Sequence, residues 1–553
     1  MSNDVTRAPF IRPRSRTLSD LLGELAERRG DATAVVHADG ATTFGALHTR
    51  ALAVATALRS LGVRRGDRVG LLMSNRIEWL ETLFGAAEVG ATVHAINTWV
   101  APREFELLVE EADCAVLVLM ASHGRRRFVD DLLATVPDIA SAAPGSWQSA
   151  RFPSLRAVVM LDDGLDSPDA RPRGVIPYPD WVTQGLADGP VPGDEGLESA
   201  AAAAVVLYTS GSTARPKAVP LLHHGMIENG FNIGGRLGLT EQDRVWLSSP
   251  LFWSFGCANA LMATFTHGAT LVLQEQFDVT AAIDVIEREA CTAAYLLPTL
   301  IYALHEKLGS DSSRIRSLRT GAMIGSADDL LMAAQDLGIE GICNVYGATE
   351  VYGNCCVTPH DMALEHRSHG QGPPLPGVTV RIVDPETRTP LSTGDVGEIE
   401  VTGYVTPGYL GDHARTSFTA DGYYKTGDLG YLDDHGWIHF AARASDIIKT
   451  SGINVAPADV EEFLVTHDSV DQVAVVGATD RLKGEIVVAF VVPRPGATID
   501  ADALITYCRT GLASYKVPAR IIVVDELAKT DTGKLSRRAL RDSAENTTTK
   551  KGT

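Results

Sequence analysis

The amino-acid sequence predicts an α/β protein of more than one domain, and three observations lead to this expectation. The chain has 553 residues, which at roughly 100–200 residues per domain suggests about two to four domains. From Leu18 onward, helical stretches alternate with short apolar strands, as in α/β folds. After about Gly430, turns rich in Gly, Asp and His separate short strands, which predicts a compact terminal domain of roughly 100 residues.

The expected elements follow from hydrophobic periodicity along the chain. The segment 145–196 is rich in Pro, Gly, Asp and Ser, so we expect an irregular surface excursion with one strand inside it. The last residues, 546–553, are polar and are expected to be frayed. Helices are expected over 47–61 and 79–89, and strands over 68–73, 115–120, 157–161, 200–208, 472–476 and 486–492.

Composition and charge exclude several classes of protein. The 49 basic and 69 acidic residues give a net charge of −20, which argues against nucleic acid and anionic membranes as partners. The apolar runs are far shorter than the roughly 20 residues of a membrane span. The seven cysteines form an odd count without a C-x-x-C pair, and the first 17 residues lack the apolar region of a signal peptide. We therefore expect reduced, buried thiols and a cytoplasmic protein.

A loop rich in hydroxyl groups follows the apolar strand that ends at Tyr208. Backbone N–H groups, hydroxyl donors and a lysine can together bind phosphate. The loop is not of the G-x-x-x-x-G-K-[ST] type, because its lysine follows a proline and precedes an alanine. Taken alone, the segment is equally compatible with an ordinary Ser/Thr turn. The candidate phosphate ligands are Thr209, Ser210, Gly211, Ser212, Thr213 and Lys217.

Four further segments carry polar groups suited to nucleotide chemistry. Thr349 and Glu350 follow a glycine turn and pair a hydroxyl with a carboxylate, which suits phosphate and Mg²⁺. Asp428 lies in a Lys-Thr-Gly-Asp turn, Arg443 opens the terminal domain, and Lys534 follows Thr-Gly near its end. Each has a simpler interpretation by itself, as a helix cap, a turn former or a solvated charge.

Together, these five segments in this order resemble the adenylate-forming superfamily, which includes acyl-CoA synthetases, peptide-synthetase adenylation domains and luciferases. The likeness runs from about Ala34 to about Leu540 and looks most like a bacterial acyl-CoA synthetase. It includes the segment 91–115 and the small-residue loop 325–327. The resemblance implies an α/β fold with a large N-terminal domain of stacked α/β subdomains, over 18–443. A small, mobile α+β C-terminal domain would follow, over 446–545, with the active site at their junction.

The resemblance also implies chemistry in two steps. A carboxylate attacks the α-phosphate of ATP to give acyl-AMP and pyrophosphate, and a thiol, usually that of CoA, then attacks the acyl-AMP. In the catalytic group, Lys534 would bridge the carboxylate and the α-phosphate, Glu350 would bind Mg²⁺, and Thr349 would bind a phosphate oxygen. Asp428 and Arg443 would bind the ribose, and Tyr346 would lie against the adenine. The wider ATP site would include Asn344, Gly347, Gly325, Ser326 and Ala327.

Several positions depart from the family pattern. Alanines 214, 218 and 442 stand where the family usually has glycine, and Ala528 stands where it has proline. Ser445 stands at the hinge, where the family usually has Asp or Lys, so we expect it to affect the thiol step more than adenylation. Lys449 and Gly452 belong to the loop that the resemblance brings to the acyl group for the thiol step.

The acyl pocket is expected to be apolar. The segment Pro-Leu-Phe-Trp-Ser-Phe-Gly over 250–256 resembles the pocket motif of the family, and we assign Trp253, Phe255, Gly256 and Gly325 to the pocket. Phe255 stands where amino-acid-activating members carry an aspartate for the α-amine. A free α-amine would therefore lack a partner, and we expect an apolar carboxylic acid as the substrate.

Three functions remain open on these residues. The first is an ATP-dependent ligase that joins a carboxylic acid to CoA. The second is an adenylating enzyme that stops at acyl-AMP, or passes the acyl group to a separate thioesterifying partner or to carrier-bound pantetheine. The third is an inactive relative that serves as a binding protein, against which Lys534, Glu350, Asp428 and Arg443 argue. Luciferase-like oxidation also occurs on this scaffold, but no residue here calls for it.

Overall fold

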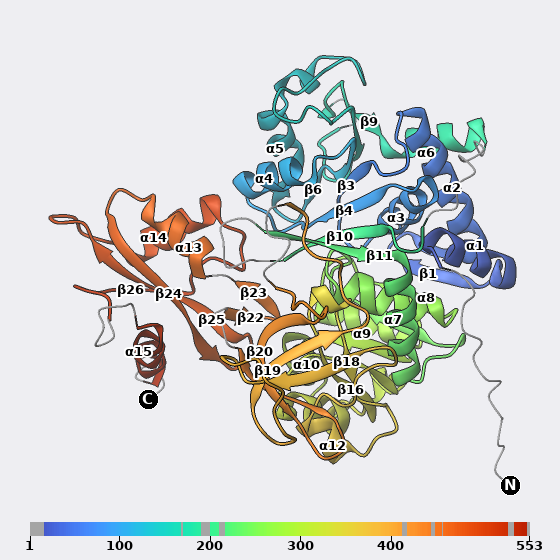
Figure 1. The fold of residues 1–553 in the computed structure, drawn as a ribbon. Coiled ribbons are helices and arrows are strands. Elements are labelled where there is room, and N and C mark those ends of the chain that lie inside the picture. Colours follow the sequence, from blue (N-terminus) through green and yellow to red (C-terminus); the bar gives the residue numbers. More distant parts are fainter. Residues whose placement is uncertain are drawn as a thin grey trace, which may run out of the picture.

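The computed structural model describes residues 16–167, 170–189, 199–209, 216–411, 417–443, 448–455, 457–528 and 536–549. In these residues, two mostly parallel sheets with their helices form the bulk of the N-terminal part, and a small antiparallel sheet lies beside them (Figure 1). A separate C-terminal sheet with its own helices lies at one side (Figure 1). The large α/β domain and the smaller C-terminal domain that we expected are thus confirmed.

A seven-stranded sheet forms between residues 68 and 222. Its strands pair in parallel except for β10 and the edge strand β11, which are antiparallel. β5 and β8 are buried over their whole length, as in parallel strands covered on both faces. The order is β11 (Lys217–Leu222), β10 (Ala203–Thr209), β4 (Thr92–Ile96), β3 (Arg68–Leu72), β5 (Val116–Met120), β8 (Ala157–Leu161) and β9 (Ile176–Pro177).

An eight-stranded sheet lies beside it and combines the chain's start with its middle. β1 pairs in parallel with β13, so residues more than 200 positions apart share one sheet. The order is β17 (Cys356–Val357), β16 (Gly341–Tyr346), β15 (Thr320–Met323), β14 (Ala293–Leu296), β12 (Arg244–Leu247), β13 (Thr270–Leu273), β1 (Thr33–His37) and β2 (Gly40–Thr43).

Helices cover these sheets and pack closely on one another. Gly85 of α3 and Gly185 of α6 lie against backbone oxygens of α2, where a Cβ atom would come within 2.8 and 2.1 Å. The longer helices are α1 (Leu18–Arg29), α2 (Phe44–Ser60), α3 (Ile77–Val89), α4 (Pro102–Ala112), α5 (Phe128–Thr135), α6 (Tyr178–Asp188), α7 (His223–Arg236), α9 (Val279–Arg288) and α10 (Pro298–Leu308). The shorter elements are β6 (Ser122–His123), β7 (Arg126–Arg127), η1 (Pro137–Ala140), η3 (Phe255–Leu261), α8 (Met262–Thr266), η4 (Ser313–Ile315), α11 (Ala327–Leu331), η5 (Met332–Asp336), η6 (Thr349–Val351) and α12 (Leu364–His369).

The C-terminal sheet shows why the segment 486–492 is apolar throughout. Alternate residues of β24 and β25 point to opposite faces: Val475 and Val487 pack with α13 and α14, whereas Val476 and Val488 pack with α15. Both faces are therefore buried. The domain contains β22 (Ile448–Thr450), β23 (Ile453–Val455), α13 (Pro457–Val465), β24 (Val470–Asp480), β25 (Gly484–Pro493), α14 (Ala501–Gly511), β26 (Arg520–Val523) and α15 (Arg537–Thr549).

The structure corrects three of the expectations from sequence. The segment 145–196 is not wholly irregular, because it contains α6, whose Gly185 lets the helix lie directly on α2. The last residues are not frayed from 546 onward, since α15 continues to Thr549. The change in composition near Gly430 does not mark the domain boundary, because it falls within an antiparallel sheet that precedes the C-terminal sheet. This sheet consists of β18 (Thr379–Val383), β19 (Gly397–Thr402), β20 (Tyr424–Leu432) and β21 (Ile438–Arg443).

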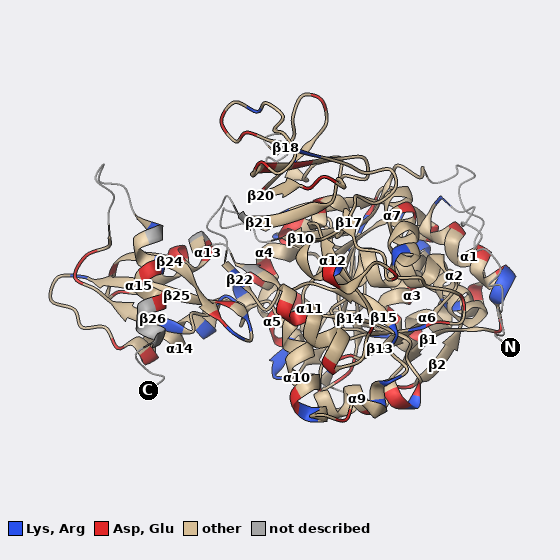
Figure 2. Cartoon of the chain, turned by 90° about the horizontal axis from the view of Figure 1, so that it is seen from below, with Lys and Arg blue, Asp and Glu red and all other residues tan. Residues whose placement is uncertain are grey.

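Charge and burial agree with the composition. Acidic and basic segments are interspersed over both domains (Figure 2). All seven cysteines are buried and unpaired, as expected. Among the helices that the structure describes, none is both long and apolar enough to cross a bilayer.

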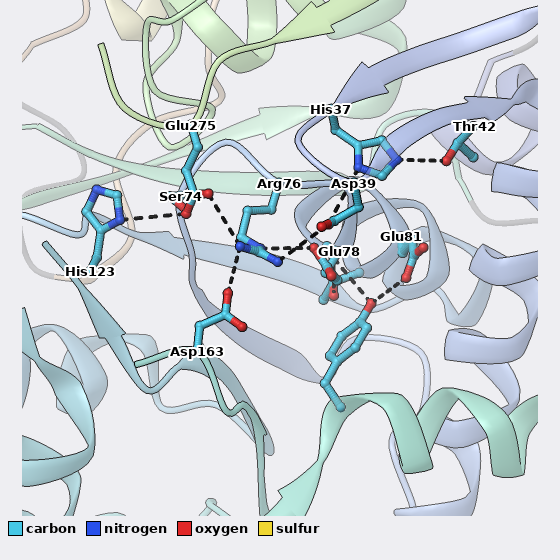
Figure 3. A network of polar contacts seen from close by, with 12 residues as sticks. His37, Asp39, Thr42, Ser74, Arg76, Glu78, Glu81, His123, Asp163 and Glu275 are labelled. Carbon is cyan, nitrogen blue, oxygen red and sulfur yellow. Dashed lines mark hydrogen bonds and ion pairs between the residues drawn. The ribbon is translucent and has the colours of Figure 1, made fainter. Parts of the chain in front are cut away.

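A mostly buried arginine, with 16% of its side chain exposed, joins the two large sheets (Figure 3). Arg76, at the start of α3, contacts Asp163 beyond β8 at 2.7 Å and Glu275 beyond β13 at 3.3 Å. It also bonds Glu78 at 3.2 Å and lies 3.9 Å from Asp39 in the β1–β2 turn. Burial lowers the pKa of Arg76, but Glu78, Asp163 and Glu275 outweigh burial and raise it. The guanidinium thus neutralises carboxylates from both sheets at one point.

We expect Arg76→Met to lower the free energy of unfolding by about 1–3 kcal/mol, between the values for exposed and buried ion pairs. The loss follows because several carboxylates would share one site without a cation. Urea unfolding followed by circular dichroism measures it. Arg314, which also contacts two carboxylates but is 42% exposed, provides the control: Arg314→Met should unfold near the parental midpoint. Equal midpoints for the two variants would contradict the role of Arg76.

Candidate active site

One cavity of about 1050 Å³ lies where the two domains meet. Its walls come from the ends of β10, β15 and β16, from the antiparallel sheet, and from the C-terminal residues 449–453, 479–484 and 515. Ligands in open α/β sheets bind at the carboxyl ends of strands, and β10, β15 and β16 all present those ends here. The sequence-predicted residues that line it are Thr209, Lys217, Trp253, Phe255, Gly325, Ser326, Tyr346, Gly347, Thr349, Glu350, Asp428, Lys449 and Gly452.

A tyrosine and an aspartate meet at the side of the cavity beside the antiparallel sheet. The Tyr346 hydroxyl, at the end of β16, donates to Asp428 Oδ2 at 3.0 Å. Burial and then the Asp428 charge raise the pKa of Tyr346, so the phenol stays protonated. The Tyr346 ring also stacks on Phe440 with centroids 6.1 Å apart. The flat aromatic ring can pack against a nucleotide base, and the buried carboxylate beside it can accept hydrogen bonds from a ribose.

A second buried carboxylate, Glu350, is held by a tyrosine that sequence analysis missed. The Tyr409 hydroxyl donates to Glu350 Oε1 at 2.8 Å, and the backbone oxygen of Glu350 accepts from Thr406 N at 2.7 Å. Lys217 Nζ lies 4.9 Å from the centre of the Tyr409 ring. The lysine and the carboxylate thus line one wall of the cavity with Tyr409 between them.

The start and end of the predicted phosphate loop lie side by side. Thr209 ends β10, Lys217 begins β11, and the two residues pair across the antiparallel ladder. Ser210, Gly211, Ser212 and Thr213 lie outside the described residues. The two loop ends therefore reach the cavity next to the wall that carries Glu350.

An aromatic cluster forms the acyl end of the cavity. Trp253 and Trp99 pack edge to face with centroids 4.7 Å apart, and Phe252 lies 5.2 Å from Trp99. Tyr515 of the C-terminal domain packs on Trp99 at 5.9 Å. Phe255 packs on Tyr295 at 5.0 Å. Aromatic rings of both domains thus border the same space.

Among the predicted residues whose side chains the structure describes, three do not line the cavity. The Asn344 amide donates to the backbone oxygens of Arg367 and Gly370 at 3.2 and 3.1 Å, so it anchors the end of α12 rather than a nucleotide. Gly256 faces the backbone, since a Cβ atom there would lie 2.2 Å from Pro250 O. Ala327 is the first residue of α11, whose N-cap Ser326 does line the cavity.

The loop between β22 and β23 reaches the N-terminal domain. Gly452 has φ of +79°, which favours glycine, and a Cβ atom there would lie 3.3 Å from Leu297 Cδ2. Lys449 Nζ lies 5.2 Å from the centre of the Phe440 ring. Ser445 and Lys534 lie outside the described residues, and of Arg443 only the backbone is described, paired with Asp428.

A buried lysine ties the two domains together at the rim of this cavity. Lys516 Nζ contacts Glu104 of α4 at 2.6 Å and Asp459 of α13 at 3.1 Å, and its side chain is only 7% exposed. Burial lowers the pKa of Lys516, but Tyr515, Glu104 and Asp459 together raise it above its ordinary value. The ammonium is therefore charged in this arrangement, and it fixes how α13 sits against α4.

Sequence reasoning missed Tyr409, Trp99 and Lys516. Tyr409 follows Pro-Gly in a turn, where an aromatic residue gives no sign of chemistry. Trp99 stands two residues after Asn97, and the Asn97 side chain accepts from Trp99 N at 3.0 Å. Lys516 and Glu104 are 412 residues apart. These three depend on tertiary contacts that local patterns do not reveal.

The residues present fit one Mg²⁺ held together with phosphates. Mg²⁺ in nucleotide enzymes binds through one or two carboxylates plus substrate phosphates, and Glu350 supplies such a carboxylate at the cavity wall. In the part of the chain that the structure describes, no group of three or more His, Cys, Asp or Glu could hold a metal alone.

Comparison with known proteins agrees with this geometry. The family model described as AMP-binding enzyme matches residues 22–410, and the AMP-binding enzyme C-terminal domain matches 459–534. The 3-[(3aS,4S,7aS)-7a-methyl-1,5-dioxo-octahydro-1H-inden-4-yl]propanoyl:CoA ligase of Rhodococcus jostii is 31% identical, over 95% of this chain and 98% of its own length. The medium-chain acyl-CoA ligase ACSF2 of Mus musculus, described as mitochondrial, is 29% identical over 96% and 88%.

Among solved structures, the o-succinylbenzoate CoA synthetase MenE of Bacillus subtilis matches with a TM-score of 0.77 and 25% identity. The match covers 94% of this chain and 98% of that one. That structure is a double mutant bound to a product analogue, OSB-NCoA. The matches extend over both domains, and the chain belongs to the AMP-binding enzyme family, among its acyl-CoA ligases.

Proposed function

We propose that this protein activates a mainly apolar carboxylic acid with ATP to give acyl-AMP and pyrophosphate, and then transfers the acyl group to the thiol of CoA. One observation carries the proposal. A single cavity joins a buried Tyr346–Asp428 pair, a Glu350–Tyr409–Lys217 wall, an aromatic end at Trp253, and the Lys449–Gly452 loop of the second domain. The reaction requires the nucleotide, the acid and the thiol to meet, and this cavity can hold all three.

In the first step, two anions must approach before they react, so cations must offset their repulsion. We propose that Tyr346 and Asp428 bind the adenosine, with Arg443 beside Asp428 on the next strand. Thr209 to Thr213, Lys217 and Thr349 would bind the phosphates. Glu350 would hold Mg²⁺, which supplies further positive charge to the phosphates when bound. Lys534 would bridge the carboxylate and the α-phosphate.

In the second step, the thiol must reach the acyl carbonyl carbon, and AMP leaves as the thioester forms. Gly452 has no side chain and lies against Leu297 at the cavity wall, so the loop leaves a narrow space beside the acyl end. We propose that the described arrangement is the one used for the thiol step, and that the domain turns about Ser445 to bring in Lys534 for adenylation. Arg481 and Lys483 line the same cavity and would meet the phosphates of CoA.

The acid is proposed to be apolar near its carboxyl group and to lack an α-amine. Trp253, Trp99 and Phe255 border the acyl end, and an ammonium group there would lose its hydration without gaining a carboxylate. The CoA ligases among the relatives support CoA over a carrier-bound pantetheine as the acceptor. The reduced thiols of all seven cysteines suit the proposed cytoplasmic location.

A panel of carboxylic acids, with and without CoA, tests the proposal. Pyrophosphate release should require ATP and an acid, and mass spectrometry should find the acyl-CoA product when CoA is present. If pyrophosphate is released but the acyl group reaches only a carrier-bound pantetheine, the acceptor is wrong. If no acid releases pyrophosphate, the function is wrong.

Lys534→Ala should reduce acyl-AMP formation by roughly 10²–10³, the usual loss for one preorganised donor at a developing charge. Pyrophosphate exchange measures this half-reaction. Lys307→Ala, which removes an exposed lysine of α10, should exchange at the parental rate. A Lys534 variant that matched this control would contradict the assignment.

Trp253→Ala should change the order in which acids are preferred while leaving the KM for ATP nearly unchanged. The reason is that Trp253 packs on Trp99 at the acyl end, away from the Tyr346–Asp428 pair. Comparing kcat/KM across the panel gives the order. A uniform loss for every acid would instead indicate a damaged fold.

Lys516→Met should slow acyl transfer to CoA more than it slows adenylation, by about tenfold or more. Two carboxylates from different domains would lose their shared cation, so the described arrangement would be less populated. Rapid-quench kinetics can follow acyl-AMP and acyl-CoA separately. Arg494→Met, a second cation of the C-terminal domain that donates to Val470 O, is the control. Equal slowing of both half-reactions would mean that Lys516 does not select between arrangements.

A further inference from the structure

The thiol acceptor has to enter the cavity along the seam between the two domains, because the nucleotide and the acyl group already occupy the N-terminal side in the proposed reaction. Two contacts between the domains border this seam at the acyl end. Tyr515 packs on Trp99 with ring centroids 5.9 Å apart, and Gly452 lies against Leu297. All four residues line the cavity. The acceptor therefore passes aromatic rings and an aliphatic side chain on its way in.

Asn97 stands beside this seam, at a place that the seven-stranded sheet determines. β4 and β10 are parallel neighbours, and Ala95 pairs with Leu207. Asn97 and Thr209 each lie two residues beyond this pair, at the same carboxyl edge of the sheet, and both line the cavity. Asn97 therefore adjoins the phosphate side of the cavity, which begins at Thr209, and the aromatic end at Trp99.

The Asn97 side chain is held in one orientation. Trp99 N donates to Asn97 Oδ1 at 3.0 Å, a bond typical of turns that asparagine makes with the backbone two residues on. Since the oxygen is engaged in this bond, the NH2 group is directed away from it. Among the residues that the structure describes, Nδ2 has no hydrogen-bond acceptor, and it is not sealed from solvent. Asn97 thus offers two N–H donors at the cavity wall.

We propose that Asn97 donates a hydrogen bond to an amide carbonyl oxygen in the pantetheine arm of CoA. The arm carries methylene and methyl groups, which suit the apolar walls at Trp99 and Leu297, and it also carries two amide groups. Each amide leaves water when the arm enters, and a desolvated amide without a new partner is costly. This inference rests on the proposed function and refines it: Asn97 selects acceptors that carry an amide as well as a thiol.

Thiols with and without amide groups test this selection in the whole protein. An acid that supports pyrophosphate exchange is assayed for thioester formation with CoA, with pantetheine and with 1-propanethiol, which has a thiol but no amide. The kcat/KM for each thiol is then compared between the parent protein and its variants. Because each thiol is compared with itself, differences in the intrinsic reactivity of the thiols cancel.

Asn97→Ser is the decisive variant, because a serine hydroxyl can still accept from Trp99 N in a similar turn but brings no NH2 group to the cavity. The kcat/KM for CoA and pantetheine should fall about five- to tenfold, the usual effect of one lost hydrogen bond. The rates with 1-propanethiol and of pyrophosphate exchange should stay at the parental values. Asn232→Ser is the matched control and should change none of these rates, since Asn232 on α7 donates to Pro376 O at 3.0 Å and does not line the cavity.

Three outcomes overturn the inference in different ways. If Asn97→Ser keeps the parental kcat/KM for CoA and pantetheine, the side chain does not bind the acceptor, and the proposed function stands without the inference. If the variant slows pyrophosphate exchange by the same factor as thioester formation, Asn97 acts on the nucleotide or on the fold. If the parent protein exchanges pyrophosphate but forms no thioester with any of the three thiols, the proposed acceptor and the inference fail together, while adenylation stands.

Discussion

The arrangement of the active site depends on one buried ion cluster, that of Lys516 with Glu104 and Asp459. Removing an ammonium from water costs several kcal/mol, and only close carboxylates can repay it. Two such carboxylates are present, one from each domain, so the lysine is stable in the buried site only while the domains stay in this relation. Every feature of the cavity that combines residues of both domains depends on that geometry.

The same contact couples the shape of the acyl end to the position of the C-terminal domain. Tyr515 precedes Lys516 and packs on Trp99, which in turn packs on Trp253. A rotation that breaks the ion cluster therefore also withdraws one ring from the aromatic cluster. The space for the acid and the orientation of the second domain are then set together, because interfaces of packed rings have discrete arrangements rather than a continuous range.

Sequence patterns predict local secondary structure, but they miss contacts between residues that are far apart in the chain. The strand 157–161 was predicted with its observed bounds, because a continuous apolar run fits a strand buried on both faces. α6 was missed because the segment 145–196 is rich in Pro, Gly, Asp and Ser, although proline is tolerated in the first turn of a helix, where Pro179 stands. Asn344 was misassigned because it stands beside true cavity residues, yet its side chain turns to the backbone of Arg367 and Gly370. Lys516 and Tyr409 acquire their partners only in the folded protein.

The turn at Tyr352 and Gly353, whose glycine lines the cavity, departs from ordinary backbone preference. Tyr352 adopts φ of +59° although it is not glycine, and its turn is held by amides of Asn229 and Asn259. Strained backbone and π-helical turns both collect at functional sites, and here they occur together. Gly353 has no side chain, and a Cβ atom there would lie 2.4 Å from Asn259 Oδ1, so the turn and η3 can lie in direct contact. A side chain at position 353 would hold the two segments apart, so the shape of this part of the cavity wall depends on the strained turn and on the glycine that follows Tyr352.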